Sequence, residues 1–114
     1  MSIHDKVRSF ILSNCVKPEN RTIGMEEECI LYTHENKRLP VNPGDEFSAT
    51  DLMSIMNSNR GLNGIYTLEP GGQLEWSSPP FQDLNSLNIA LDIHRQSLKK
   101  VVSDHNLNII SFGV

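Results

Sequence analysis

Hydrophobic positions along the chain change their spacing several times, and each spacing predicts a different element. Near the N-terminus, apolar residues follow one another at intervals of three, one and four from Val7 to Cys15, which predicts a helix over residues 4–16. Residues 22–32 resemble a strand, and residues 39–41 a short return strand after a polar turn. The first part of the chain is therefore predicted to be a helix followed by a hairpin.

The middle of the chain predicts a short helix and a second hairpin. Residues 48–51 offer several N-cap side chains before the apolar positions of residues 52–56. Two β-like runs, residues 64–69 and 73–77, are joined by a Pro-Gly-Gly sequence at residues 70–72. Proline followed by glycine fits the two central positions of a type II turn.

The longest hydrophobic pattern begins at Phe81 and predicts a long helix. Its apolar positions keep helical spacing and are Leu84, Leu87, Leu91, His94, Leu98, Val101 and Val102. Asn106 is predicted to close this helix, and residues 107–114 resemble a final strand. Locally joined strands with helices on one face predict an α+β fold with a mainly antiparallel sheet.

Length and composition favour one globular domain over residues 1–114. Hydrophobic residues make up 38% and charged residues 21% of the 114 positions, which argues against intrinsic disorder. Ten Lys and Arg against 14 Asp and Glu give a net charge of −4, which disfavours a nucleic-acid partner. No apolar run approaches the ~20 residues of a membrane span, and no secretory signal is visible. A membrane partner is therefore not expected.

The two cysteines, Cys15 and Cys29, match neither a disulfide framework nor a zinc signature. We expect both to be small buried hydrophobic residues with free thiols, in a protein located in the cytoplasm. His94 lies on the apolar stripe of the long helix, which is typical of a packed core histidine.

The first candidate for chemistry is the acidic segment Gly24–Cys29. Side chains alternate along a strand, so Glu26 and Glu28 share one face while Glu27 points to the other. Two carboxylates on one face repel each other unless a cation or a basic residue lies between them. Such an acidic run is also typical of a solvated edge strand, so this motif alone does not establish a site.

The second candidate is the Glu-Pro-Gly-Gly-Gln-Leu-Glu motif of the second hairpin. Gln73 and Glu75 share a face, and Glu69 lies just before the turn. If the two hairpins belong to one sheet, these side chains could converge with the acids of the first motif. Clustered hard oxygen ligands suit Mg²⁺ or Mn²⁺. No P-loop is present, so phosphate would have to be held through metal and side chains.

Together these motifs resemble the N-terminal part of glutamate–cysteine ligase, of the plant and proteobacterial type. The resemblance is carried, in matching order and spacing, by Thr22–Glu28, Leu68–Glu75 and Leu107–Val114. It covers most of the chain from Arg21 onward. It implies that the fold is an incomplete catalytic domain like that of glutamine synthetase.

The resemblance also implies an activity and its site. The implied reaction is the ATP-dependent joining of the glutamate γ-carboxylate to the cysteine amine through an acyl phosphate, the first step of glutathione synthesis. Its partners would be glutamate, cysteine and ATP, with Mg²⁺ or Mn²⁺. By motif matching, Glu26, Glu28 and Glu75 would be metal ligands, and Glu69 and Gln73 would line the substrate or nucleotide site. No residue is assigned to the chemical step itself.

Members of this family are several times longer than 114 residues. We therefore expect the chain to be incomplete as a catalyst and to need a C-terminal portion or a partner chain. Two other functions remain open. One is a related carboxylate–amine ligase with a different amine substrate, and the other is a non-catalytic module that binds a partner through an open sheet edge.

Overall fold

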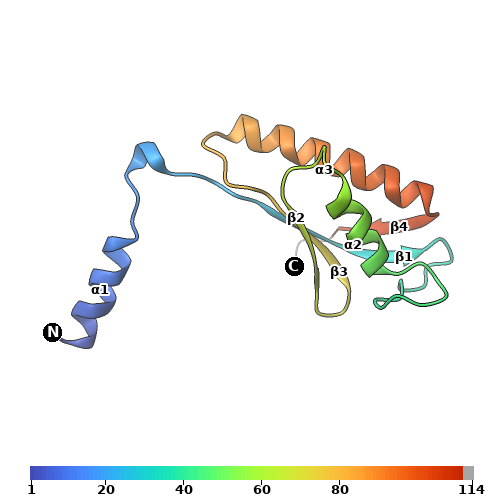
Figure 1. Cartoon of the computed structure of the whole chain (residues 1–114), viewed down its shortest axis with the longest axis horizontal. Helices are drawn as coiled ribbons and strands as arrows, with labels where there is room; N and C mark the ends of the chain where they lie inside the picture. The colour runs from blue at the N-terminus through green and yellow to red at the C-terminus, as the bar shows by residue number, and fades with distance from the viewer. Residues whose placement is uncertain (112–114) are drawn as a thin grey trace.

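Four short strands form one antiparallel sheet in the order β2-β3-β1-β4 (Figure 1). The structure is a computed structural model that describes residues 1–111. The strands are β1 (Glu26–Thr33), β2 (Ile65–Glu69), β3 (Gln73–Ser77) and β4 (Leu107–Ile110). The first half of β1 pairs with β3 and its second half with β4, so β1 connects the two parts of the sheet.

Two helices, α2 (Ala49–Ser58) and α3 (Leu84–Asp104), cover the same face of this sheet (Figure 1). Both begin at a side chain that caps the free amides of the first turn. Ser48 accepts a hydrogen bond from the backbone N–H of Asp51, and Asp83 accepts one from Ser86. This arrangement confirms the predicted α+β fold with a mainly antiparallel sheet and helices on one face.

The hydrophobic core lies between the sheet and these two helices. Every second residue of β3 points into it, so Leu74 and Trp76 are buried while their neighbours are partly exposed. The largest fully buried side chains are Trp76, Tyr66, Leu31, Leu52, Met56 and Leu74. The helices thus bury one face of the sheet and leave the other free of helical cover.

The second hairpin confirms the predicted turn. Gly71 has a φ of 87°, and the N–H of Gly72 donates to the carbonyl of Glu69 at 2.9 Å, as a type II turn requires. Only glycine adopts such a positive φ without steric cost.

The predicted return strand over residues 39–41 was wrong. The chain forms only an isolated bridge between Tyr32 and Arg38, followed by one hydrogen bond from Leu39 to β1. Pro40 has no N–H to continue a ladder. Its carbonyl instead accepts a hydrogen bond from Ala49 at 2.8 Å, which ties this segment to the start of α2.

The ends of the other strands and of the long helix also differ from the prediction. The strand expected over residues 22–32 begins at Glu26, and Ile23 forms only an isolated bridge with Phe81. Leu84, expected on the buried stripe, is exposed because it is the first residue of α3. Of the final strand predicted over residues 107–114, the last three positions, residues 112–114, lie outside the described part of the chain.

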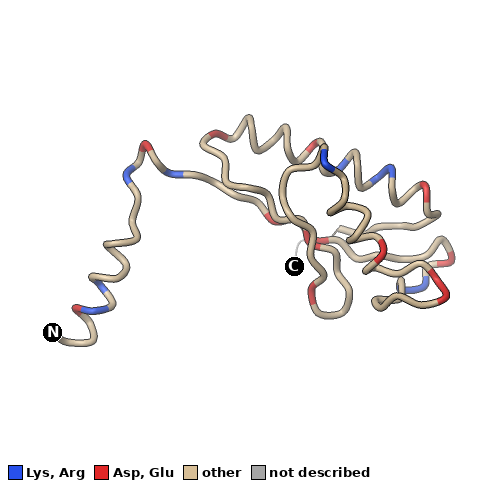
Figure 2. Tube along the Cα trace, viewed as in Figure 1, with Lys and Arg blue, Asp and Glu red and all other residues tan. Residues whose placement is uncertain are grey.

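The N-terminal helix α1 (Ile3–Ser13) stands apart from the sheet, beyond an extended segment that contains a short 3-10 turn, η1 (Pro18–Asn20) (Figure 1). None of its side chains is buried, and Val7 and Phe10 are both more than half exposed. Cys15 is exposed as well, contrary to its predicted burial. Figure 2 shows basic positions along this segment, which are Lys6, Arg8, Lys17 and Arg21. The helix was predicted correctly, but it does not pack on the sheet.

Candidate functional site

The two acidic motifs lie on adjacent strands of one sheet. In the ladder between β1 and β3, Glu28 pairs with Glu75, and Glu26 pairs with Ser77. Residues that pair directly across an antiparallel ladder project from the same face. Glu26, Glu28 and Glu75 therefore share the face that α2 and α3 leave uncovered. We refer to these three side chains as the open-face carboxylates.

Glu69 and Gln73 belong to the same face. They pair with each other at the turn end of the second hairpin, two residues away from the pair formed by Thr67 and Glu75. Since side chains alternate along a strand, both project from the side that carries Glu75. The register thus brings all five candidate residues to one side of the sheet.

The pair formed by Glu28 and Glu75 is electrostatically unfavourable as it stands. Like charges directly opposite each other destabilise a sheet. Two hydroxyls, of Ser77 and Thr67, lie 3.1 and 3.4 Å from Oε1 of Glu75 and can donate to it. None of the ion pairs formed within residues 1–111 involves an open-face carboxylate. Their charge is therefore not balanced by a basic side chain of this part of the chain.

The donor atoms of this face fit a hard divalent cation. Carboxylate oxygens are what Mg²⁺ and Mn²⁺ prefer, and Mg²⁺ commonly uses only one or two carboxylates together with water and phosphate oxygens. The directly opposed Glu28 and Glu75 offer such a pair. Across the described residues, however, no three His, Cys, Asp or Glu side chains are close enough together to hold one ion. The face fits a cation that retains other ligands, not a cage made by the protein alone.

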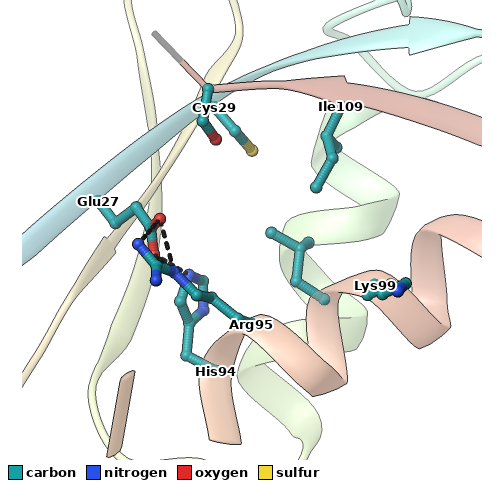
Figure 3. Close-up of a pocket in the computed structure, with 8 residues that line it drawn as sticks. Glu27, Cys29, His94, Arg95, Lys99 and Ile109 are labelled. Carbon is teal, nitrogen blue, oxygen red and sulfur yellow. Dashed lines mark hydrogen bonds and ion pairs between the residues drawn. The ribbon is translucent and has the colours of Figure 1, made fainter. Parts of the chain in front are cut away.

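The third acid of the first motif, Glu27, has a different environment. It points toward α3, where Arg95 donates to Oε1 of Glu27 from Nε at 3.0 Å and from Nη2 at 2.8 Å (Figure 3). Nε2 of His94 lies 3.3 Å from the other oxygen of the same carboxylate. α3 thus neutralises Glu27, while its two neighbours in sequence form no ion pair with any of residues 1–111.

His94 is the centre of this helix-side network. It is only 3% exposed, and its Nδ1 lies 2.8 Å from the hydroxyl of Tyr66. Its ring stacks on Trp76 with a centroid distance of 4.5 Å and an interplanar angle of 4°. A neutral imidazole that accepts from Tyr66 at Nδ1 and donates from Nε2 to Glu27 satisfies all three groups.

The pKa shifts agree with a neutral imidazole. Burial lowers the pKa of His94 below its ordinary value of 6.5, and the nearby Glu27 carboxylate opposes this shift without cancelling it. Burial also raises the pKa of the Tyr66 phenol, with Glu27 adding to the shift. Tyr66 therefore remains a hydrogen-bond donor at any physiological pH.

A cavity of about 480 Å³ lies beside this network, between α3 and strands β1 and β4 (Figure 3). Its apolar lining comes from Cys29, Leu98 and Ile109, and Glu27 and Arg95 stand at one end. None of the five candidate residues on the open face lines it. The cavity is thus separate from the predicted metal site and lies on the other side of the sheet.

Residues 22–114 match glutamate–cysteine ligase family 2 (GCS2). The chain belongs to this family. The match includes both acidic motifs, all four strands and the helices α2 and α3, and it begins after α1. No curated protein and no solved structure shows significant similarity to the chain. GCS2 membership confirms the resemblance on which the sequence-based assignment rested, and it identifies the chain with a ligase family.

GCS2 membership does not explain the helix-side network, which sequence reasoning missed. Glu27 was predicted to face away from its neighbours, and His94 was predicted to be buried; both expectations are confirmed. The contact between them was not predicted, because the two residues are distant in sequence and only the fold brings them together. The available signal was a glutamate at an inward position of a strand, together with a histidine on the apolar stripe of a long helix that is followed directly by an arginine.

Among the helices of residues 1–111, none combines the length and the apolar character needed to cross a membrane.

Proposed function

We propose that this GCS2 chain supplies the metal-binding wall of a glutamate–cysteine ligase site. The observation that carries the proposal is the direct pairing of Glu28 with Glu75 on the open face. In the reaction proposed for this family, a cation held there would lie beside the substrates ATP, glutamate and cysteine. The proposed location is the cytoplasm. Its reducing conditions are compatible with the free thiols of the chain and with these substrates.

The proposed reaction has two steps. The glutamate γ-carboxylate attacks the γ-phosphorus of ATP, which forms an acyl phosphate and releases ADP. The cysteine amine then attacks the acyl carbon, expels phosphate and forms the amide of γ-glutamylcysteine, which feeds glutathione synthesis. Mg²⁺ or Mn²⁺, when bound, would neutralise charge on the phosphates during transfer.

The chain's own contribution is binding and orientation. Glu28 and Glu75 would hold the cation directly, Glu26 would add negative charge on the same face, and Glu69 and Gln73 would line the adjoining substrate or nucleotide site. The remaining groups needed for binding and chemistry would come from further polypeptide, so we expect no robust γ-glutamylcysteine formation by these 114 residues alone. Robust turnover in an assay with ATP, Mg²⁺, glutamate and cysteine would contradict this expectation.

Calorimetric titration of the full chain with Mg²⁺ and a non-hydrolysable ATP analogue tests the metal wall. Glu28→Ala and Glu75→Ala should each weaken Mg²⁺-dependent binding at least tenfold, or by about 1.4 kcal/mol. The matched control is Glu35→Ala, which removes the same charge from an exposed turn where Glu35 pairs with Lys37 at 2.9 Å. Equal effects of all three variants would show that net charge alone matters, and the proposal would then fail.

One observation supports a second function, a non-catalytic binding module. β2 and β4 lie at the two edges of the described sheet, where a strand of another chain could pair. The same titration separates the two functions. Stable association with another chain, in the absence of any metal-dependent nucleotide binding, would favour the module. A ligase acting on a different amine would give the same metal result and differ only in product.

A further inference from the structure

His94 reaches three strands at once. Tyr66 on β2, Trp76 on β3 and Glu27 on β1 pair with one another in register and form a single row across the sheet. We call this the central row. His94 bonds to Tyr66, stacks on Trp76 and lies 3.3 Å from an oxygen of Glu27, so one side chain of α3 contacts every member of the row.

The central row lies between the two rows that carry the open-face carboxylates. One neighbouring row contains Glu26, and the other contains the pair formed by Glu28 and Glu75. Successive residues of a strand project to opposite faces. The central row therefore projects toward α3, where His94 contacts it, and the acids in the rows on either side project from the open face. A shift or twist of the central row would therefore change the separation of all three acids.

We propose that His94 is a positioning residue for the open-face carboxylates. It acts through the central row, whose three members it fixes against α3, and it does not touch the cation. The role rests on the proposed metal wall. Repulsion between Glu28 and Glu75 tends to push β1 and β3 apart at this point, and the contacts of His94 with Trp76 and Glu27 oppose that separation from the other face.

Other contacts hold the same row without reaching across it. Asn57 of α2 bonds to both backbone groups of Tyr66, at 2.8 and 2.9 Å, and the indole N–H of Trp76 donates to the carbonyl of Asn63 at 2.8 Å. Each of these contacts fixes one strand to its surroundings. His94 adds to the backbone ladders a side chain that contacts all three members of the row.

The test uses Mn²⁺ alone as the probe, with free Mn²⁺ measured by electron paramagnetic resonance during titration of the full chain. Tyr66→Phe removes only the hydroxyl that bonds to His94, and His94→Gln removes a ring that is neutral in the fold. Neither substitution changes the charge near the cation. Both should weaken Mn²⁺ binding by roughly tenfold, as partners that orient metal ligands commonly do.

Ser48→Ala is the control for a purely structural effect. Ser48 is fully buried and caps α2, so its loss lowers stability without touching the central row. Mn²⁺ affinities are compared at a temperature where circular dichroism shows each variant to be folded. If Ser48→Ala weakens Mn²⁺ binding as much as Tyr66→Phe does, the effect is structural and the positioning role is overturned.

Glu28→Ala separates the failure of this role from the failure of the metal wall. If Glu28→Ala weakens Mn²⁺ binding while Tyr66→Phe leaves it unchanged, the wall stands and His94 has no positioning role. If the wild-type chain binds no Mn²⁺, or if Glu28→Ala has no effect, both proposals are overturned. Should His94→Gln fail to fold, Tyr66→Phe decides the outcome.

Discussion

Cys29 and Cys15 are the same residue type in opposite surroundings. Cys29 is buried in the core, at the last position of β1 that pairs with β3, whereas Cys15 is exposed just beyond α1. Burial raises the pKa of the Cys29 thiol to about 12, and the Glu27 carboxylate adds to the shift. Since the thiolate is the reactive form, Cys29 is chemically inert in the folded chain.

Thiol labelling at pH 8 should therefore show two phases. We expect Cys15 to react with Ellman's reagent at the rate of a free thiol, and Cys29 to react roughly 100-fold more slowly or only after unfolding. The variant Cys15→Ser should lose the fast phase and keep the slow one. Two fast thiols in the folded protein would contradict the burial of Cys29.

The titration of His94 should make stability depend on pH. An unfolded histidine binds a proton near pH 6.5, while His94 in the fold binds it only at lower pH because burial lowers its pKa. Between these two values the unfolded chain holds the extra proton, so acidification favours unfolding. The free energy of unfolding should fall as pH drops through 6.5 and stop falling, as far as this group is concerned, once the folded pKa is passed.

Urea unfolding between pH 7.5 and pH 5 measures this dependence. Each unit by which the pKa of His94 is lowered contributes about 1.4 kcal/mol to the difference across this range. His94→Gln should flatten the curve over this range, and Ser48→Ala, which destabilises α2 without removing an ionisable group, should lower the curve and keep its slope. Parallel curves for wild type and His94→Gln would show that other groups cause the dependence.

Among the elements, the second hairpin depends on where its glycines lie. Gly64 precedes β2 with a φ of 104°, and a Cβ at this position would overlap the carbonyl oxygen of Ser77 and lie 2.7 Å from Nε1 of Trp76. Gly71, at the turn, has a φ of 87° but open space around the position of a Cβ. Both glycines have a positive φ, and they differ in what surrounds them.

Substitution by alanine should separate the cost of a positive φ from the cost of steric overlap with β3. Gly71→Ala should destabilise the fold by about 1 kcal/mol, from the left-handed backbone alone. Gly64→Ala should cost roughly 3 kcal/mol, because overlap with β3 adds to the backbone cost. Chemical denaturation monitored by tryptophan fluorescence gives both values. Equal losses would mean that β3 moves aside freely at Ser77.

Local sequence rules predicted the regular elements well. The bounds of β3 were predicted to the residue, and the Pro-Gly-Gly turn has the predicted geometry. Most of the buried side of α3 also followed from spacing alone. The strand predicted over residues 39–41 does not form because its carbonyls accept hydrogen bonds from the start of α2, and a contact between distant segments cannot be read from local pattern.

In the molecule as a whole, the family region and α1 are distinct parts. The GCS2 match begins at residue 22, and α1 ends at Ser13 without one buried side chain. The N-terminal segment is basic and the rest of the chain acidic, with four of the 10 Lys and Arg in the first 21 residues. Stability should therefore reside in the region from residue 22 onward.

A variant lacking residues 1–20 tests this division. Its free energy of unfolding should change by no more than about 0.5 kcal/mol, because no buried surface is lost. The circular dichroism signal should fall by the contribution of the 11 residues of α1. A markedly lower melting temperature would show that α1 packs on the sheet in solution.

The candidate site was predictable only in part, because it depends on how elements distant in sequence are arranged in the whole molecule. Strand alternation correctly grouped Glu26 with Glu28, and Gln73 with Glu75, from sequence alone. Placing both pairs on one face required knowing that the hairpins are adjacent in one sheet, which was a hypothesis until the register was known. The contact of His94 with Glu27 depends on how α3 crosses that sheet, and the local signals at the two residues do not specify that they meet.

The three consecutive glutamates of β1 cannot define their own alignment. If β1 slipped by one residue against β3, Glu26 and Glu28 would turn toward α3 and Glu27 toward the open face, and each position would still carry a glutamate. The slip is prevented further along the strand, where Cys29 and Leu31 would have to leave the core. Two uncharged side chains, Cys29 and Leu31, therefore determine which glutamates face the solvent. A polar substitution at Leu31 would weaken this control of the register, although every carboxylate would still be present.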